Sequence, residues 1–120
     1  MTKLLKQEWS FMKEREKSIL RKMKAYAEQI IQFKADMDFE TFSKDAKTIS
    51  ACVFNLSQMG ELAGRLEDDF YEKYPHIPWR KMMGMRNRIV HDYEGIILNI
   101  VWDAIVDSLP EFIKYIDNIE

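Results

Sequence analysis

The sequence has little of what many classes of small protein depend on. It contains one cysteine, four glycines and three prolines in 120 residues. A single cysteine excludes a disulfide framework and a metal site built from several thiolates. So few glycines and prolines leave too few turn positions for a sheet of many strands. No segment shows the alternation of apolar and polar residues that is typical of a strand.

The sequence also lacks a large excess of charge of one sign and lacks long apolar runs. The formal net charge is -2, whereas a protein that coats nucleic acid through counterion release needs a clustered positive surface. A small basic patch remains compatible with this balance. The N-terminus has no apolar stretch long enough for a signal peptide, and no segment approaches the length of a membrane span. We therefore expect a cytoplasmic protein with no membrane partner.

Apolar residues at helical spacing are what the chain does contain. Residues 9–36 carry apolar side chains three or four positions apart, which predicts a long helix with one buried face. A coiled-coil or partner-binding face is the alternative. The stripe consists of Ile19, Met23, Tyr26, Ile30, Phe33 and Met37.

A second long helix is predicted from about Asp45 to Tyr71. Gly60 lies inside it at a cost of about 1 kcal/mol relative to alanine. We expect a neighbouring helix to pass close to Gly60, and a functional role is the alternative. Asn55 and Glu61 are off the apolar stripe, so solvent is their expected environment.

The remaining boundaries follow from capping residues and prolines. Asp38 or Thr41 could cap a short helix that ends at residue 43. Pro78 suits the first turn of a third helix that ends near residue 92, and Pro110 should kink or restart the last helix. The predicted buried stripe of the third helix is Met82, Met85 and Ile89. The chain is expected to form one all-α domain, an up-and-down bundle of four to five helices.

Polar groups concentrate in the third helix between Arg86 and Tyr93. Asn87 and His91 are four residues apart and share a face, and Arg88 is also a helical neighbour of His91. Arg86 points about 140° away from His91 by the helical count. Arg86 could therefore join His91 only by a long sideways reach, or at a site shared between two subunits.

Histidine and arginine together suit the cleavage of RNA without a metal ion. His91 can move a proton at the ribose 2′-hydroxyl or the leaving oxygen, while an arginine stabilises charge on the phosphate. A metal site is not expected, because Asp92 beside His91 rather than a turn away gives a poor ligand set. No cofactor is expected either. The alternative is a surface arginine patch with a histidine bonded to a carboxylate.

Residues 86–93 match the signature of the HEPN superfamily, an arginine, four residues, a histidine, one residue and a tyrosine. The sequence resembles the HepT-like branch in particular, and residues 73–80, 83–87, 101–103 and 109–110 agree with it, as do Gly60 and Glu61. The resemblance begins near Arg15. It leaves residues 1–14 as an N-terminal extension of a single domain that spans residues 1–120.

The resemblance implies the toxin of a prokaryotic two-gene toxin–antitoxin system, a metal-independent endoribonuclease. Its antitoxin would be a minimal nucleotidyltransferase of the MntA type. The family also implies a homodimer in which two motif helices face each other, with Arg86, Asn87 and His91 as the catalytic set of a composite cleft. Arg88 is a further residue that could contact RNA.

Tyr93 is, by the same resemblance, the residue onto which the antitoxin transfers AMP from ATP. Phosphate charge and adenosine bulk two residues from His91 would repel or block RNA. The alternative for Tyr93 is an aromatic side chain packed against the last helix. The alternative for the whole chain is a non-catalytic subunit that presents substrate to a nucleotidyltransferase.

Overall fold

The computed structural model describes residues 9–75, 77–91 and 98–120, with the backbone alone at residues 90 and 91. Its elements are α2 (Glu14–Lys34), α3 (Phe39–Ser43), α4 (Ala46–Ala63), α5 (Phe70–Lys73), α6 (Trp79–His91), α7 (Leu98–Asp103), the π-helical segment η2 (Ala104–Ser108) and α8 (Leu109–Ile119). All of these elements are helical, which confirms the all-α prediction. None of the helices in the described ranges is long and apolar enough to cross a membrane.

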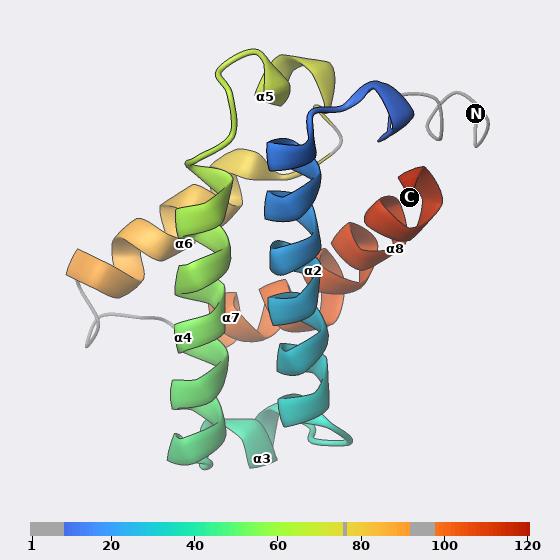
Figure 1. Cartoon of the computed structure of the whole chain (residues 1–120). Helices are drawn as coiled ribbons and strands as arrows, with labels where there is room; N and C mark the ends of the chain where they lie inside the picture. Colours follow the sequence, from blue (N-terminus) through green and yellow to red (C-terminus); the bar gives the residue numbers. More distant parts are fainter. Residues whose placement is uncertain (1–8, 76, 92–97) are drawn as a thin grey trace.

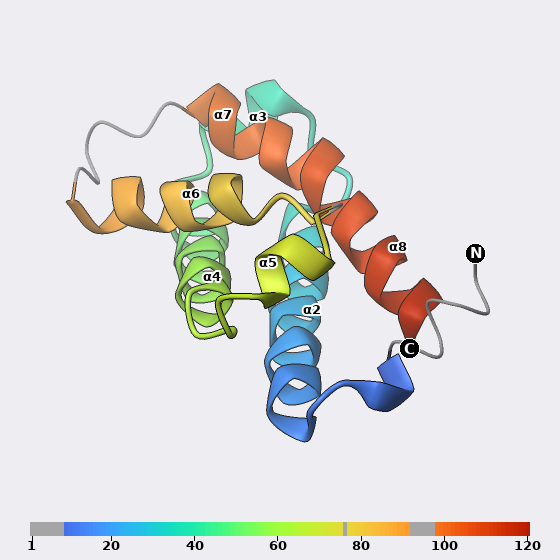
Figure 2. The same ribbon diagram turned by 90° about the horizontal axis from the view of Figure 1, so that it is seen from above.

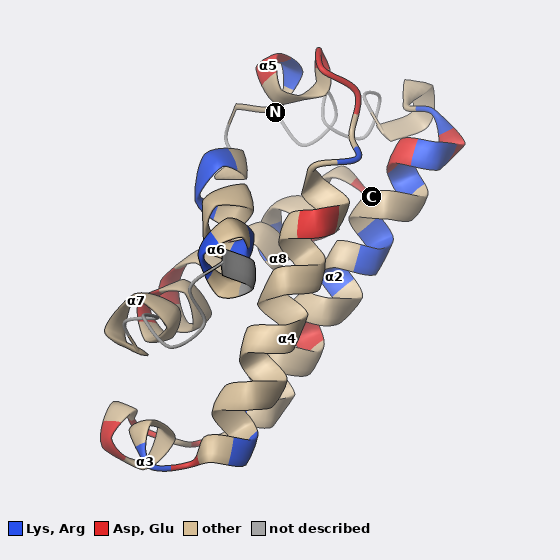
Figure 3. Cartoon of the chain, turned by 90° about the vertical axis from the view of Figure 1, so that its left-hand side faces the viewer, with Lys and Arg blue, Asp and Glu red and all other residues tan. Residues whose placement is uncertain are grey.

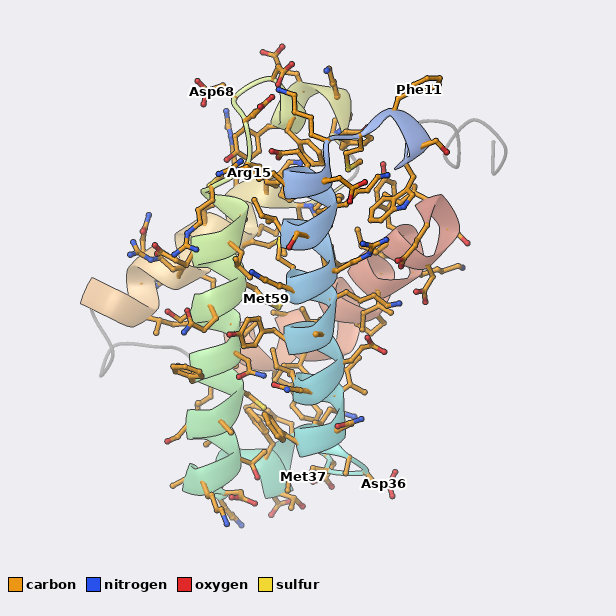
Figure 4. All side chains as sticks on the ribbon, viewed as in Figure 1. Phe11, Arg15, Asp36, Met37, Met59 and Asp68 are labelled. Carbon is orange, nitrogen blue, oxygen red and sulfur yellow. The ribbon has the colours of Figure 1, made fainter. Side chains whose placement is uncertain are left out.

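Helices α2 and α4 lie side by side and run in opposite directions (Figure 1). Figure 4 shows Met59 of α4 between the two ribbons. Asn55 is also buried there, and its side-chain amide donates to the carbonyl of Tyr26 at 3.2 Å and to Oε1 of Gln29 at 2.9 Å. The prediction that Asn55 faces solvent is therefore wrong, because partners on α2 satisfy its amide.

The remaining long helices form a second layer across this pair. Figure 2 looks along α2 and α4 and shows α6 and the continuous run of α7, η2 and α8 on one side of this pair. Apolar side chains of the last run are buried beneath it, which closes a single core. They are Val101, Ile105, Leu109, Phe112 and Ile116.

The first long helix differs from its prediction at its start and on its face. It begins at Glu14, after a short separate helical turn at residues 9–11. Phe33 of the expected stripe is 39% exposed, whereas Leu20 and Ala27 are fully buried. The buried face therefore lies slightly to one side of the predicted stripe.

The second long helix is shorter than predicted, because α4 ends at Ala63. The Tyr71 hydroxyl donates to the carbonyl of Ala63, the last residue of α4, at 2.8 Å, and it also lies 3.4 Å from the carbonyl of Leu66. Leu66 and Phe70 are buried even though they lie beyond α4. Their helical spacing made the stripe seem continuous.

Aromatic side chains fix the connection from α4 to α6. The Trp79 ring meets Phe70 and Tyr71 edge-on, with centroids 5.6 and 5.7 Å apart. The Trp79 indole N–H donates to the carbonyl of Tyr74 at 2.9 Å. The third helix begins at Trp79, one residue after the start predicted at Pro78. The first turn of α6 is thereby held in one place on the core.

Caps and breaks confirm two further predictions. The Asp38 carboxylate accepts the backbone N–H of Thr41 at 2.8 Å, so Asp38 is the cap of α3. The last helix changes from π-helical to α-helical immediately before Pro110. At this point η2 ends, and the Leu109 N–H bonds to the carbonyl of Ala104. A proline removes one backbone donor from the ladder, which accounts for an irregular turn at this point.

Candidate functional site

The site is built where α6 crosses α4 at Gly60. A Cβ atom on Gly60 would lie 2.3 Å from the Cβ of Arg86 and 2.7 Å from the carbonyl oxygen of Met82. Both distances are far below ordinary van der Waals contact, so only glycine allows the two helices to approach this closely. The predicted close approach at Gly60 is confirmed, and its contact is the motif arginine.

The Arg86 guanidinium is held by two acceptors. Its Nη2 lies 2.9 Å from Oε2 of Glu61 on α4, and its Nη1 donates to Oδ1 of Asn87 at 2.9 Å. About a third of the Arg86 side chain, 32%, stays exposed. The other oxygen of Glu61 lies 3.9 Å from Nη2 of Arg65, which lies two residues beyond the end of α4. Arg86 is thus oriented and still open to solvent.

The contact between Glu61 and Arg86 was not predicted from the sequence. The expected place of Glu61 in solvent is only half correct, because Glu61 is partly buried and paired with Arg86. The signal was present in its position beside Gly60, since a residue next to a close helix crossing can reach the crossing helix. The partner itself could not be read from the spacing.

Arg88 lies on the other side of α6, about 160° from Arg86 by the helical count. It borders a cavity of about 700 Å³ between α4, α6 and the last helical run. Met82 and Met85 also line this cavity and are only partly buried, so the predicted buried stripe of α6 is correct for Ile89 alone. The structure therefore separates Arg88 from the pair formed by Arg86 and Asn87.

The remaining motif residues are only partly described. His91 is the last residue of α6, but its side chain lies outside the described residues, as does Tyr93 entirely. The predicted joining of Arg86 to His91 and the predicted role of Tyr93 as the AMP acceptor therefore stay predictions. The structure brings together Arg86, Asn87 and Glu61.

Helix α6 is basic although the chain as a whole is slightly acidic. Its sequence holds two arginines within the motif, and an arginine and a lysine in its first turn, with no aspartate or glutamate. Figure 3 shows these basic positions on α6 beside an acidic position on α4. A local positive surface of this kind suits contact with phosphate groups.

Comparison with known proteins shows the family to which the chain is related. The family model described as Ribonuclease HepT-like matches residues 23–119. A Methanocaldococcus jannaschii protein named as a candidate RNase is 41% identical over 75% of this chain and 74% of its own length. A second candidate RNase from that organism is 34% identical over 86% of this chain and 89% of its own length.

A Thermococcus cleftensis protein named as a probable ribonuclease HepT is 32% identical over 82% of this chain and 90% of its own length. No solved structure matches the chain. The matched family span runs from the middle of α2 to the end of α8 and includes the Arg86 site. The chain therefore belongs to the HepT-like ribonuclease family.

Proposed function

We propose that the protein is a metal-independent endoribonuclease and the toxin of a toxin–antitoxin pair. The observation that carries this proposal is the Arg86 guanidinium, which is held by Glu61 and Asn87 and partly open to solvent on a basic helix. Family membership supplies the expectation that RNA is the substrate. Arginine suits this role because its guanidinium group is planar and permanently charged, and its N–H donors match the oxygens of a phosphate.

Arg86, His91 and Asn87 divide the reaction between them. The histidine takes the proton from the ribose 2′-hydroxyl, and the 2′-oxygen attacks phosphorus as the bond to the 5′-oxygen breaks. The leaving 5′-oxygen receives a proton from a second copy of His91, which a dimer would supply. The products carry a cyclic phosphate and a 5′-hydroxyl. Arg86 stabilises the charge on the phosphate oxygens, and Asn87 fixes one edge of the guanidinium.

A homodimer is the second part of the proposal. By helical count, Arg86 points about 140° from its own His91, and the structure holds Arg86 against α4. Two copies of the motif helix would supply the second histidine and let Arg86 serve the neighbouring subunit. Sedimentation should give a dimer at micromolar concentration. A monomer alone under those conditions would remove the composite site.

Control by a nucleotidyltransferase antitoxin is the third part, and the match of Tyr93 to the family motif supports it. Incubation with the partner and ATP should add the mass of one or more adenylate groups. Peptide mapping should place them on Tyr93, and Tyr93→Phe should remove them. The same modification on the Tyr93→Phe protein would refute the assignment.

Expression in a bacterial host tests the nuclease proposal in its simplest form. The wild-type chain should slow growth, and Arg86→Ala and His91→Ala should relieve the effect. Arg21→Ala is the matched control, because it removes an arginine that is exposed on α2, outside the basic surface of α6. If both motif variants affect growth as the wild type does, the chain instead fits a non-catalytic subunit that presents substrate to a nucleotidyltransferase.

A further inference from the structure

Glu61 is the acidic residue in contact with the proposed catalytic arginine. Its Oε2 lies 2.9 Å from Nη2 of Arg86, and the two side chains are 41% and 32% exposed. A partly exposed ion pair of this kind contributes little to folding stability, because water screens it and both side chains lose freedom. Its geometry therefore matters more for where the guanidinium points than for stability.

We propose that Glu61 is a positioning residue for RNA cleavage, an inference that rests on the proposed nuclease function. Its carboxylate holds Arg86 so that the free edge of the guanidinium meets the phosphate at the bond to be cleaved. Arginine has five N–H donors. The contacts to Glu61 and Asn87 use one donor on each terminal nitrogen, so donors remain for a phosphate.

Gly60 supports this role from the other end of the arginine side chain. The missing Cβ of Gly60 lets the Cβ of Arg86 rest against α4. The helix contact therefore fixes the base of the side chain, and Glu61 fixes its tip. A flexible side chain held at both ends loses little further freedom when substrate arrives, which favours a reactive geometry.

The net charge around Arg86 explains how Glu61 can position the arginine without blocking the binding of a phosphate. A lone glutamate beside Arg86 would cancel its charge and repel a phosphate. Arg65 lies 3.9 Å from the other oxygen of Glu61, so the group of two arginines and one glutamate keeps a net positive charge. The carboxylate can hold Arg86 while the group as a whole still attracts RNA.

The test measures steady-state RNA cleavage by full-length wild type, Glu61→Ala, Glu61→Gln and Glu61→Asp. A misplaced catalytic group lowers the chemical rate, so we expect kcat of Glu61→Ala to fall by about tenfold to a hundredfold. KM should change by less than about threefold, because the charge that attracts RNA is retained. Glu61→Gln keeps an acceptor and Glu61→Asp keeps the charge, so each should recover part of the rate.

Glu67→Gln is the matched control. Glu67 is 43% exposed and pairs with Lys13 at 2.7 Å, so this change removes a similar surface ion pair away from Arg86. Glu67→Gln should keep wild-type kcat, and all variants should unfold at nearly the wild-type temperature. In an Arg86→Ala background, Glu61→Ala should cause no further loss, because the residue through which it acts is gone.

Two failures are distinguishable. Wild type that cleaves no RNA would overturn the proposed nuclease function itself. Active wild type with Glu61→Ala at the rate of Glu67→Gln would overturn the positioning role alone. Faster cleavage by Glu61→Ala would also overturn it, because that result would make Glu61 a block on Arg86.

Discussion

Gly60 and Gly84 are helical glycines with opposite surroundings. Gly60 lies under Arg86 and the carbonyl of Met82, while a Cβ on Gly84 would meet nothing within 4 Å. We expect Gly60→Ala to lower the free energy of unfolding by about 1–3 kcal/mol through overpacking. Gly84→Ala should raise it by about 1 kcal/mol, because alanine is the better helix former and the space is open.

Chemical denaturation of the two variants beside wild type checks this pair of predictions. Gly84→Ala is the control for the general effect of alanine in a helix. Gly60→Ala should also reduce RNA cleavage, because the Arg86 side chain must shift. Equal stabilisation by both substitutions would show that α6 does not pass as close to Gly60 as the structure places it.

Cys52 offers a second prediction at the scale of one side chain. It is completely buried in α4. Burial, with a smaller effect from the charge of Asp45, raises the pKa of its thiol to about 11. Little thiolate exists at pH 8 and reagents cannot reach it, so the native protein should resist alkylation, whereas denaturant should release one reactive thiol. Rapid labelling without denaturant would contradict the packing of α4.

Single residues also mark the limit of what the sequence could predict. The close contact at Gly60 was predictable, because a helical glycine carries a cost that needs a reason. The hydrogen bonds of Asn55 to α2 and the ion pair of Glu61 with Arg86 were not. Their partners lie on other helices, and spacing within one helix contains no information about which residue meets them.

At the scale of elements, two aspartate caps make stability depend on pH. The Thr41 backbone N–H bonds to Asp38 and the Thr48 backbone N–H bonds to Asp45, and these bonds hold the pKa of each carboxyl below its usual value. A lowered pKa in the folded state means that the stabilisation is complete above the unfolded pKa, near 4. It is lost as the pH falls through the folded pKa.

Asparagine can cap a helix but has no group that titrates. A variant with Asp38→Asn and Asp45→Asn therefore tests this dependence on pH. Asparagine caps helices about as well as aspartate. The loss of unfolding free energy between pH 7 and pH 3 should be smaller in this variant than in wild type. Urea denaturation followed by circular dichroism at both pH values gives the comparison. Equal losses in the two proteins would mean that these caps do not titrate with folding.

Element boundaries were predictable where a residue type forces them and not elsewhere. Pro78, Pro110 and Asp38 place their boundaries correctly, because each restricts the backbone or supplies a cap. The end of α4 was missed. Leu66 and Phe70 continue its apolar spacing after the helix has stopped, and the Tyr71 hydroxyl bond that closes α4 depends on the fold of the connection.

At the scale of the whole molecule, amphipathic spacing was enough to predict an all-α bundle. It could not predict that α6 and the last helical run cross the α2–α4 pair (Figure 2). That crossing brings Arg86 to Glu61 and leaves Arg88 at the cavity on the other side of α6. The functional roles of the motif residues came from resemblance to a family, since spacing alone left a surface arginine patch as an alternative.

Polar contacts join the start of α2 to the residues that follow α4. Arg15 and Asp68 lie at the same end of the molecule (Figure 4). Arg15 donates to the carbonyl of Arg65 at 2.6 Å, and Lys13 pairs with Glu67 at 2.7 Å. These contacts hold the residues that follow α4 against the start of α2. The Arg86 site itself lies on α4 and α6, which pack directly against each other at Gly60.

Cleavage of RNA by the purified protein in the presence of EDTA tests the central claim most directly. Under the proposed mechanism, wild type should cleave with EDTA as it does without, because proton transfer and positive charge come from His91 and Arg86 and not from a metal ion. Arg86→Ala and His91→Ala should each be slower by about a hundredfold or more. Loss of cleavage in EDTA, or cleavage by both variants at the wild-type rate, would contradict the account.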